Sequence, residues 1–155
     1  MRKLNLIAIL CIFAAPLPAS AQEASVEQGR YVAMTAGCND CHTAGYGPAE
    51  GNVPETEWLK GDSMGWRGPW GTTYGVNLRL RLSEMNEDEW IEFAKTFKTR
   101  PPMPWFNVHA MNETDLRSFH KYVMTFEDKG EPAPDYVPPD REPEGPFIQF
   151  PEIPH

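Results

Sequence analysis

The chain has 155 residues, of which 22 are acidic and 14 are basic, so its formal net charge is −8. This length has room for one main domain. Its acidic balance argues against nucleic acid and against anionic membrane surfaces as partners, because both carry negative charge themselves.

The N-terminal residues have the layout of a secretory signal peptide. A basic start is followed by a mostly apolar run over residues 4–15, and a small-residue Ala-Ser-Ala signal ends at Ala21. We expect cleavage after Ala21 and export to the periplasm. A membrane anchor is the alternative, but the run is too short, because crossing a bilayer takes about 20 apolar residues. We therefore divide the chain into a signal peptide (1–21), a main domain (22–129) and a tail (130–155), and expect no transmembrane segment in the mature chain.

The first expected helix covers residues 25–36. Ser25 begins a capping-box pattern, and Gly37 supplies a C-terminal stop. Gly29 stands in the middle of this helix, where glycine costs about 1 kcal/mol relative to alanine. Close approach of another helix would explain a glycine at this position.

The next stretch, residues 43–82, is irregular, with many glycines, several prolines and four aromatic anchors. A structureless stretch of this length in a compact domain needs a functional or packing role. Wrapping a large, flat, apolar cofactor would be such a role.

Two further helices are expected to begin after Asn86 and Asn112. Each asparagine can cap a helix whose first turn carries acidic residues, which face the positive end of the helix dipole. The proline pair after Arg100 ends the first of them. Both helices carry apolar and aromatic residues at helical spacing, which we interpret as core: Trp90, Phe93, Ala94 and Phe97, then Leu116, Phe119, His120, Val123 and Phe126. The proline-rich tail is either disordered or lies along the domain surface. Its apolar residues near the end favour the second.

The run Cys38-Asn39-Asp40-Cys41-His42 carries the chemistry. Cys-x-x-Cys-His is typical of covalent attachment of one haem c, in which the two thiols add to vinyl groups and the histidine becomes an iron ligand. Because Cys11 lies within the signal peptide, Cys38 and Cys41 are the mature cysteines. A disulfide or a thioredoxin-like redox pair shares their spacing, but His42 directly after Cys41 favours haem. A zinc site would need a second pair of ligands.

Met103 is the predicted sixth ligand of the iron. It follows two prolines and precedes a third, in a stiffened segment that would hold a weakly bound thioether in place. The other candidates are Met34, Met64, Met85, Met111, Met124, His109 and His120. Position does not exclude Met64, which lies in the glycine-rich stretch, and we interpret the two histidines as core or surface residues. If the sixth position were open instead, the protein would bind, sense or react with a small gas molecule.

Residues 25–128 resemble class I cytochrome c, on the haem motif, the later Met103-Pro104, the glycine-containing helix before them and the aromatic helix after them. The resemblance implies an all-α fold of three main helices around one haem. It also implies a long glycine-rich loop around the haem, followed by the extended tail. It further implies that the first and last helices cross at Gly29, with Phe119 or Tyr122 facing it.

The run from Gly68 to Leu78 resembles a segment in the cytochrome subunits of membrane-bound alcohol, aldehyde and sugar-acid dehydrogenases. By that resemblance Trp70, Tyr74 and Asn77 would be haem-pocket residues. The chain departs from those subunits after Asn77 and carries one haem motif where they often carry three. Arg79 and Arg81, which follow, would either reach the haem propionates or lie on the surface.

Together these patterns predict a periplasmic single-electron carrier rather than an enzyme. Its expected partner is a redox protein: a dehydrogenase, an oxidase or another cytochrome. It would act as a free shuttle or as a subunit docked on a larger redox enzyme through its tail.

Overall fold

The computed structural model of the chain describes residues 23–151. The predicted signal peptide and its cleavage site therefore lie outside the described residues, as do residues 152–155. In chain order the described elements are α1 (Val26–Thr35), α2 (Cys38–His42), the 3-10 helix η1 (Glu55–Glu57), β1 (Gly65–Gly68), β2 (Gly71–Tyr74), α3 (Leu78–Ser83), α4 (Glu87–Thr96), α5 (Trp105–Ala110), α6 (Glu113–Val123) and β3 (Phe147–Gln149).

The predicted all-α class with three main helices is wrong. The described part of the chain has six α-helices and a three-stranded mixed sheet of order β2-β1-β3. Strand β1 pairs antiparallel with β2 and parallel with β3. Gly71, at φ 96°, allows the tight turn between β1 and β2. Strands this short and rich in glycine lack the alternation by which a strand is recognised, so residues 65–74 were expected to be loop.

The predicted helix caps are confirmed. Ser25 accepts a hydrogen bond from the amide of Gln28, Asn86 forms a complete capping box, and Asn112 accepts from the amide of Asp115. Each side chain satisfies a backbone donor that the first turn of a helix leaves free. These caps explain why α1, α4 and α6 begin where the sequence predicts.

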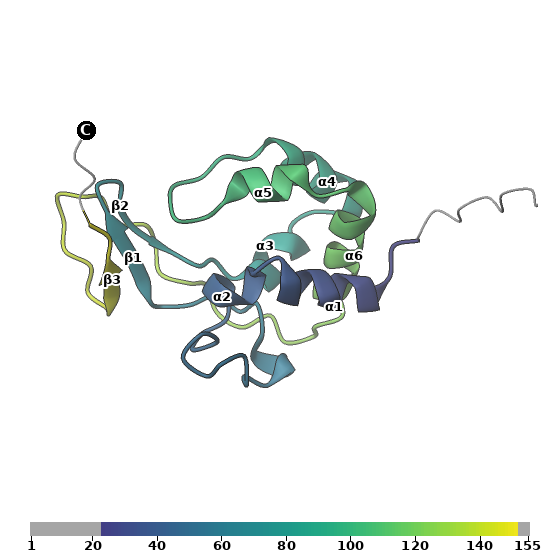
Figure 1. The fold of residues 1–155 in the computed structure, drawn as a ribbon, viewed down its shortest axis with the longest axis horizontal. Coiled ribbons are helices and arrows are strands. Elements are labelled where there is room, and N and C mark those ends of the chain that lie inside the picture. Colours follow the sequence, from purple (N-terminus) through teal and green to yellow (C-terminus); the bar gives the residue numbers. More distant parts are fainter. Residues whose placement is uncertain (1–22, 152–155) are drawn as a thin grey trace, which may run out of the picture.

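Helices α1 and α6 cross in close contact, as expected (Figure 1). A Cβ at Gly29 would overlap the carbonyl oxygen of Ser118 and lie 2.6 Å from the Cβ of Tyr122. The residues that face Gly29 are therefore Ser118 and Tyr122 rather than Phe119. Around this crossing lies the core, to which α4 contributes Trp90; its indole Nε1 donates to the carbonyl oxygen of Leu116 at 2.9 Å.

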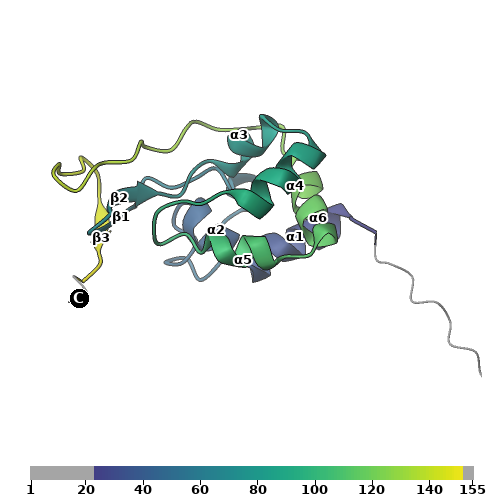
Figure 2. The same cartoon turned by 90° about the horizontal axis from the view of Figure 1, so that it is seen from above.

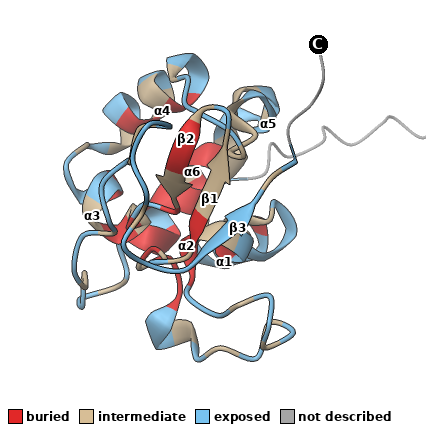
Figure 3. Ribbon diagram, turned by 90° about the vertical axis from the view of Figure 1, so that its left-hand side faces the viewer, coloured by how far each residue is buried: buried red, intermediate tan, exposed pale blue. Residues whose placement is uncertain are grey.

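The sheet lies at one end of the molecule, away from the start of α1 (Figures 1 and 2). The tail runs back along the domain to reach it, so the tail is ordered over its described residues and contributes a strand instead of being only extended. Val137 exchanges two backbone hydrogen bonds with Thr72 of β2, at 2.7 and 3.0 Å. Strand β3 is exposed, whereas the start of β2 is buried (Figure 3). None of the described helices is long and apolar enough to cross a membrane.

Candidate functional site

The short helix α2 carries both cysteines of the haem motif. Gly37, at φ 73°, separates α1 from α2 and lets the chain turn there. The thiols of Cys38 and Cys41 form no disulfide. Burial raises the pKa of Cys38 to about 12, and burial together with the Asp40 carboxylate raises the pKa of Cys41. Both thiols therefore stay protonated at neutral pH, which is the opposite of the lowered pKa that a thioredoxin-like pair requires.

His42 is oriented by a backbone carbonyl from a distant segment. Its Nδ1 lies 2.7 Å from the carbonyl oxygen of Val76. Since a carbonyl oxygen only accepts, Nδ1 carries the proton, and the lone pair is on Nε2. Burial also lowers the pKa of His42, although the bond to Val76 opposes this shift. A neutral imidazole whose other nitrogen is fixed by a carbonyl is the usual state of a metal-binding histidine.

The segment that supplies this carbonyl packs directly on α2. A Cβ at Gly75 would overlap the carbonyl oxygen of Cys41, so the two backbones meet where only glycine fits. The amide of Gly61 donates to the carbonyl oxygen of His42 at 2.8 Å, and the amide of Asp62 donates to that of Gly75 at 3.0 Å. Two parts of the glycine-rich stretch, residues 61–62 and residues 75–76, therefore position His42.

A cavity of about 610 Å³ opens beside α2. This volume falls within the range of about 300–1,000 Å³ that is typical of ligand and cofactor sites. Its lining is mostly apolar and comes from all six described α-helices, the end of β2 and the segments between them. It includes Cys38, Cys41 and His42 together with Val32, Leu82, Trp90, Phe93, Phe97, Leu116 and Phe119. The aromatic stripes interpreted as core thus also form walls of this cavity.

Met103 lines the same cavity, on the connection between α4 and α5. In Figure 1 this connection and α5 lie above α2. Of the other methionine candidates, Met111 also lines the cavity. The two histidine candidates are engaged elsewhere: Nε2 of His109 contacts the carbonyl oxygen of Phe97 at 2.8 Å, and Nε2 of His120 contacts that of Met85 at 3.1 Å.

The three residues expected in the pocket by resemblance have different surroundings. Tyr74 lines the cavity, whereas Trp70 and Asn77 are not part of its lining. Trp70 packs on Phe150 of the tail, with ring centroids 5.3 Å apart. Asn77 is buried and caps α3. The structure thus brings Cys38, Cys41, His42, Met103 and Tyr74 around one cavity; the haem contacts of Trp70 and Asn77 stay predictions.

The two arginines after Asn77 also have different surroundings. Arg81 lines the cavity, and its guanidinium lies 2.7 Å from the Glu84 carboxylate. Arg79 is buried beneath the glycine-rich stretch and donates to four backbone carbonyl oxygens, including that of Trp58 at 2.7 Å. Its guanidinium also lies 3.6 Å from the centroid of the Phe126 ring. Arg79 therefore holds the fold together, and Arg81 is the arginine at the cavity.

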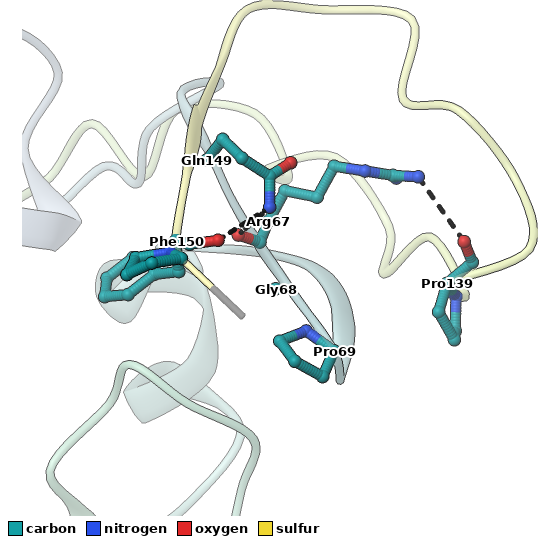
Figure 4. A pocket seen from close by; sticks show the side chains of 7 residues that line it. Arg67, Gly68, Pro69, Pro139, Gln149 and Phe150 are labelled. Carbon is teal, nitrogen blue, oxygen red and sulfur yellow. Dashed lines mark hydrogen bonds between the residues drawn. The ribbon is translucent and has the colours of Figure 1, made fainter. Parts of the chain in front are cut away.

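A second cavity, of about 450 Å³, lies between the β1–β2 hairpin and the tail (Figure 4). Arg67, Pro139, Gln149 and Phe150 are among its lining residues. The guanidinium of Arg67 donates to the carbonyl oxygens of Arg141 at 2.8 Å and of Pro139 at 3.4 Å. These groups already satisfy one another, so this cavity marks the attachment of the tail.

A comparison with known proteins finds a similarity to a cytochrome subunit. The chain is 28% identical over 120 residues to the fructose dehydrogenase cytochrome subunit of Gluconobacter japonicus. The match supports a cytochrome c-like protein. It covers 71% of this chain and 23% of the relative, so the matched region spans about a quarter of the relative's length. No family model and no solved structure matches the chain.

The residues around the cavity fit a haem. Two thiols stand one helical turn apart, a neutral histidine offers Nε2, and a thioether and an aromatic wall complete the lining. Sequence reasoning missed Gly75 and the carbonyl of Val76, which hold α2 and His42. A backbone carbonyl carries no residue-type signature, so no pattern could have found it.

Proposed function

We propose that this chain is a single-electron carrier that binds one haem c in the cavity beside α2. Cys38 and Cys41 would hold the group through two thioether bonds, and His42 and Met103 would bind its iron. The bound iron supplies reversible one-electron chemistry between its ferric and ferrous states. The observation that carries the proposal is the presence of both thiols, His42 and Met103 in the lining of one cavity.

The chain's own residues have three tasks in this function. Val76 keeps the proton on Nδ1 of His42, which leaves Nε2 free to bind iron. The apolar walls, among them Trp90 and Phe119, exclude water. Burial and the loss of water tune the potential of a bound group. No acid–base chemistry is required of the protein, so the proposed role is electron transfer and not catalysis.

We further propose that the mature protein works in the periplasm, with a redox protein such as a dehydrogenase as its partner. The signal-peptide pattern that ends at Ala21 supports export. The similarity to a cytochrome subunit of a dehydrogenase supports the class of partner. N-terminal sequencing of the exported protein tests the first point. Electron transfer from purified dehydrogenases, followed by haem absorbance, tests the second.

The ligand assignment is tested with Met103→Ala, and Met111→Ala is the matched control because Met111 lines the same cavity. We expect the reduced wild type and Met111→Ala to be low spin and closed to carbon monoxide. Met103→Ala should become high spin and bind carbon monoxide. An unchanged spectrum in Met103→Ala would refute the assignment. Ready binding of carbon monoxide by the wild type would favour the gas-binding function instead.

A further inference from the structure

The segment that carries Met103 has little structure of its own. Among the described residues, no backbone-to-backbone hydrogen bond involves residues 98–102, and most of them are exposed. After this gap, the amide of Trp105 donates to the carbonyl oxygen of Met103 at 2.9 Å. The prolines restrict the backbone of the segment, but its position relative to the rest of the domain depends on contacts with other parts of the chain.

One of these contacts comes from the β1–β2 hairpin. The hydroxyl of Thr73 donates to the carbonyl oxygen of Pro101 at 2.7 Å. Thr73 belongs to β2, where the ladder with β1 holds its backbone opposite Trp66. A residue fixed in a strand thereby fixes the carbonyl two residues before Met103.

The second contact comes from the C-terminal tail. The guanidinium of Arg100 lies 3.8 Å from the centroid of the Tyr136 ring, within the range of a cation–π interaction. The hydroxyl of Tyr136 donates to the carbonyl oxygen of Trp70, at the hairpin turn, at 2.9 Å. The next residue, Val137, pairs with β2.

The tail is itself anchored on the hairpin. Arg67 of β1 donates to two tail carbonyl oxygens, one of which is drawn in Figure 4. Phe150 packs on Trp66 and Trp70, with ring centroids 6.1 and 5.3 Å apart. The hairpin and the tail thus form one unit, and that unit contacts the Met103 segment at both Arg100 and Pro101.

We propose that the hairpin and the tail act as a clamp that sets the position of Met103, with Thr73 and Tyr136 as positioning residues. The clamp deepens the proposed function, since it rests on Met103 being an iron ligand. A thioether binds iron weakly, so the fraction of ligated protein depends on how well the segment is preorganised. Coupling is reciprocal: a clamp that favours ligation must itself be stabilised by ligation.

The test uses the full-length, haem-loaded protein and two variants, each of which removes one of the two contacts with the Met103 segment. Each variant also loses a hydroxyl contact within the hairpin–tail unit, from Thr73 to the carbonyl oxygen of Trp66 at 3.4 Å or from Tyr136 to that of Trp70 at 2.9 Å. Thr73→Val removes the hydroxyl and keeps the branched shape. Tyr136→Leu removes the ring beneath Arg100. Loss of one hydrogen bond or ring contact should raise the fraction of iron open to carbon monoxide about five- to tenfold.

Three controls separate positioning from general destabilisation. Thr73→Ser keeps the hydroxyl donor, and Tyr136→Phe keeps the ring, so both should stay near wild type in carbon monoxide accessibility. Thr96→Val removes a hydroxyl that bonds only within its own helix, to the carbonyl oxygen of Glu92 at 2.8 Å, and should also leave ligation unchanged. Far-UV circular dichroism checks that each variant is folded.

The outcomes are distinguishable. If Thr73→Val and Tyr136→Leu match wild type in carbon monoxide accessibility while Met103→Ala opens the iron, the clamp is refuted and the ligand assignment stands. If Met103→Ala leaves the iron closed, the ligand assignment falls and the clamp has no ligand to position.

Discussion

Replacing Gly29 with alanine should destabilise the protein, although the same change in an exposed helix would stabilise it. The new Cβ would overlap the carbonyl oxygen of Ser118 on α6. Adding a methyl group to a tightly packed contact costs about 1–3 kcal/mol. Because the opposing atom belongs to the backbone and cannot rotate away, we expect the upper end of this range.

The helix itself favours alanine over glycine by about 1 kcal/mol. The two effects together predict a net loss of about 2 kcal/mol in the free energy of unfolding. With a urea m-value of about 2 kcal/mol/M, the unfolding midpoint should fall by about 1 M. The assay is urea unfolding followed by far-UV circular dichroism.

Gly47→Ala is the matched control, because no atom lies within 4 Å of the position that its Cβ would take. Its unfolding midpoint should stay close to that of wild type. If Gly29→Ala is as stable as wild type, or more stable, α1 and α6 do not cross in close contact at Gly29.

Two further predictions concern side chains that join distant segments. Asn77 caps α3 and donates to the carbonyl oxygens of Lys129 and Glu131, where the tail begins, at 2.6 and 2.9 Å. Asn77→Ala should therefore lower the free energy of unfolding by about 2–3 kcal/mol. Asn77→Asp keeps the cap but loses both donors; equal stability of Asn77→Asp and wild type in urea unfolding would show that the tail contacts contribute nothing. Burial pushes the pKa of Glu55 up, but hydrogen bonds from Tyr122 and Arg30 outweigh it and hold that pKa below its usual value. A carboxyl with a lowered folded-state pKa stabilises the fold above its unfolded pKa of about 4.3 and loses this contribution as pH falls through the folded value. In urea unfolding across this acid range, the free energy of unfolding should fall less steeply with falling pH in Glu55→Gln than in wild type. If the free energy falls in parallel in the two proteins, this prediction is wrong.

Local chemistry explains which parts of the fold could be predicted. The caps at Ser25, Asn86 and Asn112 and the stop at Gly37 act within one turn of the chain, so their patterns can be read directly. The hairpin could not be read in this way, because its strands carry no alternating pattern and are stabilised by pairing with each other and with a tail some 80 residues away. The all-α prediction failed there for that reason.

The candidate site also has parts that the local sequence predicts and parts that only the tertiary structure decides. The motif from Cys38 to His42 is contiguous, and the prolines around Met103 mark it as a stiffened segment, so the sequence by itself determined which groups could bind a haem. Tertiary structure decided that Met103 and Met111 share the cavity, that Arg81 reaches it while Arg79 does not, and that Val76 orients His42. The physical reason is that attachment chemistry depends on residue type and short spacing. The orientation of His42 and the enclosure of the cavity depend instead on backbone groups and on segments that meet only when the chain is folded.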